Sequence, residues 1–217
     1  PSADLGAAVQ VAVKARTINN GQSCIAAKRF IVHRDIADAF IPRFAQAMAA
    51  LVVGDPMDER TQVGPLAGAQ LVEDLEAQVQ QSVVRGARVL TGGTRVAGRG
   101  FFYAPTVLAD VPPGTPAWSD ELFGPVASVF VARDADDAIR IANDTRFGLG
   151  ASVWTRDRAE AARFVRDLQA GSVFVNAMVA SDPRFPFGGV KASGYGRELG
   201  GYGLREFVNV KTVRVRL

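Results

Sequence analysis

The chain has 217 residues, 48% of them hydrophobic, and its 25 basic against 22 acidic residues give a formal net charge of +3 at pH 7. It can therefore bury a sizeable core as one domain or two small ones, while so mild a charge argues against a nucleic-acid partner. With one cysteine and one histidine, it cannot build an internal disulfide framework, nor a zinc site unaided, so we expect no metal centre.

No basic-then-apolar leader follows Pro1, and no apolar run approaches the roughly 18 residues of a membrane span. A single thiol also suits a reducing compartment. We therefore expect no membrane partner and a cytoplasmic location.

The first predicted element is a helix capped by Asp4, with apolar residues at helical spacing over residues 5–13. Asn19-Asn20-Gly21 should end it, and a strand is predicted over residues 30–32. A second helix is predicted over 36–51, with a kink at Pro42, and a third over 71–83. Short strands are predicted over 87–90 and 101–108, on either side of a glycine-rich surface turn without a phosphate-binding motif.

Further strands are predicted over 126–131, 151–154 and 173–175, separated by a helix capped by Asp134 and another that ends near Leu168. Residues 178–203 read as a long irregular segment, and 207–217 as an extended, β-branched one. The alternation of strands and helices predicts an α/β fold, with a doubly wound, mainly parallel sheet and flanking helices.

The only cysteine, Cys24, follows the break at Gly21. We expect it to open a new helical turn, where free N–H groups and the helix dipole favour thiolate over thiol. Lys28, four residues on, adds a weak positive influence if that turn is helical. Because a thiolate is the reacting form of a nucleophilic cysteine, Cys24 is the candidate catalytic residue; the alternative is a buried, inert thiol.

Three stretches carry a resemblance in order and spacing: Asn20-Gly21-Gln22-Ser23-Cys24, Asp120-Glu121-Leu122-Phe123-Gly124-Pro125-Val126, and the glycine-rich segment from Pro186 to Glu198. Together they resemble the catalytic-cysteine, Glu-x-Phe-Gly-Pro and C-terminal glycine-rich motifs of the NAD(P)-dependent aldehyde dehydrogenase superfamily. Details after Val175 favour its bacterial succinate-semialdehyde dehydrogenase-like branch.

The resemblance implies a catalytic domain over residues 1–206 and, over 207–217, a C-terminal oligomerisation strand used in a homo-oligomer (dimer or tetramer). The family's cofactor-binding domain, its general-base glutamate segment and its oxyanion-hole asparagine lie upstream and match nothing here. The implied function is oxidation of a small-molecule aldehyde to a carboxylic acid with NAD or NADP. The reaction would pass through a thiohemiacetal and a thioester on Cys24, and this chain alone should be inactive.

Residue by residue, the resemblance implies that Glu121 and Phe123 hold the nicotinamide ribose. It places Asn176, Ser181 and Phe187 near the aldehyde entrance, where Ser181 could hydrogen-bond a polar substrate tail. Without it, Glu121 would read as a loop acid, Phe123 as a core anchor and the other three as ordinary loop residues.

One departure concerns the substrate. Several succinate-semialdehyde enzymes have a basic residue just before the cysteine motif; here that position is Ile18, with Arg16 two residues earlier.

Two other functions stay open. A cysteine hydrolase would need His33, the only imidazole, as its base. A non-catalytic interaction module would leave Cys24 buried and inert.

Overall fold

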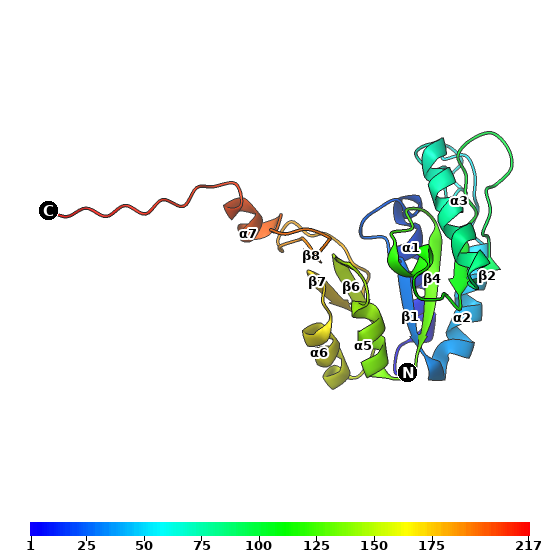
Figure 1. The fold of residues 1–217 in the computed structure, drawn as a ribbon, viewed down its shortest axis with the longest axis horizontal. Helices are drawn as coiled ribbons and strands as arrows, with labels where there is room; N and C mark the ends of the chain where they lie inside the picture. Colours follow the sequence, from blue (N-terminus) through cyan, green and yellow to red (C-terminus); the bar gives the residue numbers. More distant parts are fainter.

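The computed structural model describes residues 1–217 (Figure 1). Its larger sheet has four strands in the order β1-β4-β3-β2. They are β1 (Arg29–His33), β2 (Arg88–Thr91), β3 (Thr106–Ala109) and β4 (Val126–Ala132). β4 is parallel to both β1 and β3, whereas β2 runs antiparallel to β3 at the edge. The mainly parallel sheet predicted from the sequence is confirmed.

Helices cover both faces of this sheet. Helices α1 (Leu5–Thr17) and α2 (Arg34–Ala49) pack on one face, and α3 (Ala69–Val84), α4 (Pro116–Ser119) and α5 (Ala135–Asn143) on the other. The helix starts follow the expected capping chemistry: the side chain of Asp4 accepts a hydrogen bond from the N–H of Ala7, and that of Asp134 from the N–H of Asp137. The doubly wound arrangement is therefore confirmed.

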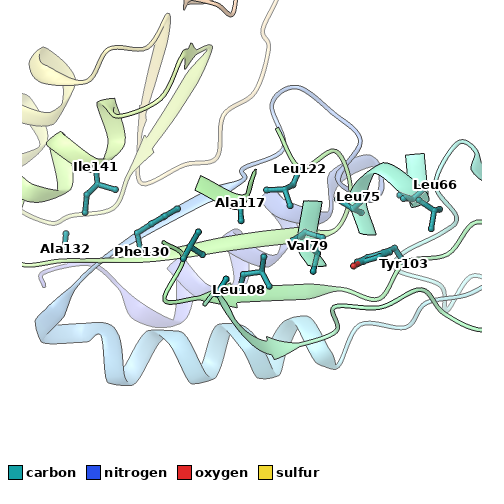
Figure 2. Packing of buried hydrophobic residues seen from close by; sticks show 14 residues of the cluster. Leu66, Leu75, Val79, Tyr103, Leu108, Ala117, Leu122, Phe130, Ala132 and Ile141 are labelled. Atoms are coloured by element: carbon teal, nitrogen blue, oxygen red, sulfur yellow. The ribbon is translucent and has the colours of Figure 1, made fainter. Parts of the chain in front are cut away.

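The core is two layers because strand residues alternate between faces. On β4, Phe130 packs with α3, α4 and α5, while its neighbour Val129 packs with α1 and α2. Figure 2 shows the first of these clusters as a continuous row along the sheet, from Leu66 to Ile141.

A second group of elements follows α5. It consists of β5 (Phe147–Gly148), β6 (Gly150–Val153), α6 (Arg158–Asp167), β7 (Ser172–Val175), β8 (Val190–Lys191) and α7 (Gly200–Arg205). β6 and β7 pair in parallel and β5 and β8 antiparallel, apart from the larger sheet. Figure 1 shows this group beside the first, with residues after α7 leading away as an extended, exposed tail. An ion pair between Asp4 and Arg156 (3.0 Å) joins the two groups.

Some local predictions were wrong. No helix begins at Cys24, which lies in a turn before β1. The short helix α4 was not predicted, because its four residues are too few to show a period. Residues 178–203, predicted as irregular, include β8 and the start of α7. None of the helices combines the length and apolar character needed to cross a membrane.

Candidate active site

The candidate nucleophile lies in a tight turn between α1 and β1. Asn19, Asn20 and Gly21 adopt positive φ values of 49°, 56° and 77°, which turn the chain away from the helix. The N–H of Ala26 then donates to the carbonyl of Ser23 (3.0 Å). Cys24 stands exposed in this turn. The prediction of a buried, inert thiol, made by the interaction-module reading, therefore does not fit.

Two side chains before the cysteine anchor the turn to the segment over residues 64–67. The Nδ2 of Asn20 donates to the carbonyl of Pro65 (3.2 Å), and its Oδ1 accepts from the N–H of Gly64 (2.8 Å). The Oε1 of Gln22 accepts from the N–H of Ala67 (3.1 Å). These side-chain hydrogen bonds give the Asn-Gly-Gln part of the motif a structural role, and none of them involves the Cys24 thiol.

The cysteine turn packs directly against the segment that carries Glu121 and Phe123. A Cβ on Gly21 would lie 2.2 Å from the carbonyl oxygen of Gly124, so only glycine permits this approach. The fully buried Arg16 reinforces the contact: its guanidinium donates to the carbonyls of Gly21 (2.7 Å) and Val126 (3.1 Å). Two motifs about a hundred residues apart in sequence therefore form one site.

Burial lowers the pKa of Arg16 to about 9, against the opposing attraction of Glu121, and the guanidinium stays charged at pH 7. Because both its bonds go to backbone carbonyls inside the core, Arg16 is a structural residue. It does not stand in for the basic residue that is missing at Ile18.

Lys28 connects the turn of the candidate nucleophile to the Glu121 segment. Its ammonium group donates to three carbonyls of the turn at 3.0–3.2 Å, those of Ser23, Cys24 and Ala26. The same Nζ lies 2.9 Å from the Oε1 of Glu121 and 5.9 Å from the centroid of the Phe123 ring. Burial lowers the pKa of Lys28, which the bond to Glu121 opposes. Sequence reasoning noticed Lys28 only as a helical neighbour of Cys24 and missed this role.

Glu121 and Phe123 are both partly exposed, in contrast to the buried Leu122 between them. Lys28 engages one carboxylate oxygen of Glu121, and the side chain is 38% exposed, so the carboxylate can still accept hydrogen bonds from hydroxyl groups. The ring of Phe123 offers an apolar face beside it. The pair therefore fits the ribose and nicotinamide end of a dinucleotide.

The three residues predicted near the aldehyde entrance lie in the second group of elements. The amide of Asn176 bonds the backbone N–H and carbonyl of Thr155 at 3.0 and 2.9 Å. Phe187 pairs with Glu198 through two backbone hydrogen bonds, and Ser181 is exposed. No hydrogen bond or ion pair joins these three to Cys24, Glu121 or Phe123, so their role at the entrance stays a prediction.

His33 lies at the far end of β1 from the Cys24 turn. Its Nδ1 accepts a hydrogen bond from the N–H of Asp35 (3.2 Å) and so caps α2. The five-residue strand places it about 15 Å along the chain from the turn. The structure gives the hydrolase reading no general base beside the thiol.

These features together define a cysteine-centred site on an α/β scaffold, and comparison with known proteins assigns its class. The sequence profile of the aldehyde dehydrogenase family matches residues 1–213, and the chain belongs to that family. It is 55% identical over 215 residues to succinate-semialdehyde dehydrogenase [NADP(+)] 1 of Mycobacterium ulcerans, covering 99% of this chain and 47% of that protein. The chain thus spans about half the length of the curated relatives it matches.

Solved structures agree with the assignment. An NADP-dependent enzyme of E. coli superposes with a TM-score of 0.93 at 38% identity, covering 97% of this chain and 44% of that one. Succinate-semialdehyde dehydrogenase from Burkholderia pseudomallei gives a TM-score of 0.91 at 38% identity, covering 95% and 43%. The resemblance drawn from three motifs is therefore confirmed at the level of the family and its fold.

Proposed function

We propose that this chain is the catalytic-domain part of an enzyme that oxidises an aldehyde to a carboxylic acid with NAD or NADP. The observation that carries the proposal is the meeting of an exposed Cys24 with Glu121 and Phe123 through one ammonium group. An exposed thiol fits nucleophilic attack, and the carboxylate–aromatic pair fits a nicotinamide riboside.

In the proposed reaction the Cys24 thiolate adds to the aldehyde carbonyl and forms a thiohemiacetal. Backbone N–H groups of the turn, that of Cys24 among them, are the available donors for the developing oxyanion. The bound dinucleotide supplies the acceptor for the hydrogen and electron pair that leave the thiohemiacetal. Water then cleaves the thioester on Cys24 and releases the acid, which requires a base.

Succinate semialdehyde is the proposed substrate, since relatives 55% identical to this chain are named for it and for NADP(+). The basic residue of some such enzymes is replaced by Ile18, and Arg16 is buried in the core. The carboxylate of succinate semialdehyde must therefore be bound by residues other than those at positions 16 and 18. We propose that exposed Ser181 contributes a hydrogen bond to it, with Asn176 and Phe187 lining the same entrance.

Residues 207–217 are proposed to pair as a strand with another copy in a homo-oligomer. They follow α7 as an exposed extended segment whose apolar residues find no cover within the chain. We also propose a cytoplasmic enzyme, because an exposed catalytic thiol must stay reduced to act as a nucleophile.

The test is an assay of NAD and NADP reduction in two proteins: the 217-residue chain, and a chimera in which it replaces the matching 47% of the Mycobacterium ulcerans relative. The chain alone should give no turnover, because Glu121 is ion-paired to Lys28 and no other carboxylate contacts the Cys24 turn. The chimera should oxidise succinate semialdehyde, and Cys24→Ser should abolish that activity. An active Cys24→Ser chimera would contradict the proposal.

Substrate choice has its own readout in the chimera. Ser181→Ala should raise the KM for succinate semialdehyde while leaving butanal, which lacks the carboxylate, unchanged. A hydrogen bond to a charged group is worth about 1.5–3 kcal/mol, so an increase of about tenfold or more is expected. Equal effects on the two aldehydes would remove Ser181 from the substrate site.

A further inference from the structure

We propose that Lys28 is a positioning residue that couples the Cys24 turn to the carboxylate of Glu121, so that a ligand engaging Glu121 changes how firmly the nucleophile is held. The inference rests on the proposed roles of Cys24 and Glu121. It adds a residue that bonds both ends of the site and a reason for their communication.

The coupling follows from a count of donors and acceptors. An ammonium group has three N–H donors. Around the Nζ of Lys28 lie four oxygen acceptors within 3.2 Å: three carbonyls of the turn and the Oε1 of Glu121. The side chain of Lys28 is only 15% exposed, so water has little access to supply the missing fourth donor. The four acceptors compete, and any weakening at Glu121 strengthens the bonds to the turn.

Electrostatic interactions also couple the Cys24 turn to Glu121 through Lys28. The ammonium of Lys28 attracts a thiolate at Cys24, repels the buried guanidinium of Arg16, and is balanced by Glu121. When hydroxyl groups of a ligand hydrogen-bond to Glu121, its charge is shared and the ammonium acts more strongly on the turn. Lysine suits this position because the four oxygens converge on one point, which a compact ammonium fits better than a planar guanidinium with donors spread around its edge.

The first test is the rate at which iodoacetamide, an uncharged reagent, alkylates Cys24 in the 217-residue chain. Lys28→Met should slow labelling at pH 7 by roughly threefold or more, because the thiolate loses the attraction of the ammonium and the carbonyls of the turn lose their hydrogen bonds to it. Lys28→Gln retains N–H donors without the charge, so its labelling rate should lie between those of wild type and Lys28→Met. If Lys28→Met does not fold, Lys28→Gln takes its place in the test.

Lys191→Met is the matched control. The Nζ of Lys191 also donates to backbone carbonyls, those of Asn143 (2.8 Å) and Thr145 (3.1 Å), which lie at and just after the end of α5 and not in the Cys24 turn. Its replacement should leave the labelling rate unchanged. If Lys28→Met and Lys191→Met label at the wild-type rate, Lys28 does not position the nucleophile and the proposal is wrong.

The second test is a double-mutant cycle on the same rate. Glu121→Gln should speed labelling in the wild-type chain by freeing the ammonium for the turn, and should have at most half that effect, in logarithmic terms, when Lys28 is Met. The same fold-change in both backgrounds would mean that Glu121 and the turn are not coupled through Lys28. Thiol labelling needs no turnover, so an inactive chimera would overturn the proposed function while this cycle still decided the role of Lys28.

Discussion

Position 21 requires glycine for two reasons: its φ is positive, and the backbone of Gly124 lies too close for a Cβ. Its φ is +77°, and a Cβ there would lie 2.2 Å from the oxygen of Gly124. Gly114 has almost the same φ, +78°, with nothing within 4 Å of its Cβ position. Both alanine variants incur backbone strain of about 1–3 kcal/mol, but only Gly21→Ala must also separate the two site segments.

We therefore expect Gly21→Ala to lower the free energy of unfolding by at least about 1 kcal/mol more than Gly114→Ala does. Urea denaturation followed by circular dichroism measures both variants. Gly21→Ala should also alter the rate of Cys24 alkylation, which Gly114→Ala should not. Equal losses of stability would show that the approach to Gly124 relaxes at little cost.

Two buried serines give opposite predictions at the same scale. The Ser82 hydroxyl donates to the carbonyl of Gln78 (2.8 Å) and accepts from the N–H of Ala117 (3.0 Å). The Ser128 hydroxyl on β4 is buried without any hydrogen-bond partner. Ser82→Ala should cost about 1–2 kcal/mol because it leaves a buried N–H unpaired, whereas Ser128→Ala should be neutral or stabilising. Thermal unfolding midpoints of the two variants decide this, and destabilisation by Ser128→Ala would contradict it.

Among the elements, α5 carries the clearest pH dependence. Asp137 in its first turn is buried and accepts hydrogen bonds from Arg133 and Arg140. Those bonds hold the pKa of the Asp137 carboxyl well below its ordinary value. A lowered carboxyl pKa stabilises the fold above the unfolded-state value near 4, and that stability is lost as the pH falls toward the folded-state value.

Asp137→Asn should therefore lower the thermal unfolding midpoint at pH 7, and the difference from wild type should shrink between about pH 5 and pH 2. Asp136→Asn is the control, since it removes the same charge from the same helical turn but at an exposed position paired only with Arg163. It should have little effect at any pH. A pH-independent loss in Asp137→Asn would point to packing as the cause.

Elements were predicted well where periodicity is strong. The capped helices α1 and α5 begin where Asp4 and Asp134 indicated, and the helix predicted over 36–51 is α2, which contains Pro42; the kink expected at Pro42 stays a prediction. The helix expected at Cys24 was wrong because the inference used only the glycine break and local charge. In the structure Lys28 and the partners of Asn20 hold a turn there instead, and these are tertiary contacts.

At the scale of the whole molecule, the exposed tail over residues 207–217 can be tested for a role in oligomer formation. Side chains alternate along a strand, so Val213 and Val215 should share one face and Arg214 should lie on the other. In the chimera, Val213→Lys with Val215→Lys, or truncation before Phe207, should shift the mass measured by light scattering to smaller species. Arg214→Ala should not. An unchanged mass after truncation would remove the tail from the subunit interface.

The sequence by itself determined the family and the α/β class and indicated Cys24 as the candidate nucleophile, because short motifs and hydrophobic periods are local properties of the chain. It could not show that Gly21 packs on Gly124 or that Lys28 bonds both the Cys24 turn and Glu121. Those contacts join segments about a hundred residues apart, and only the packing of helices on both faces of a parallel sheet brings them together. Tertiary structure decided the site because hydrogen bonds and close approach depend on distance in space.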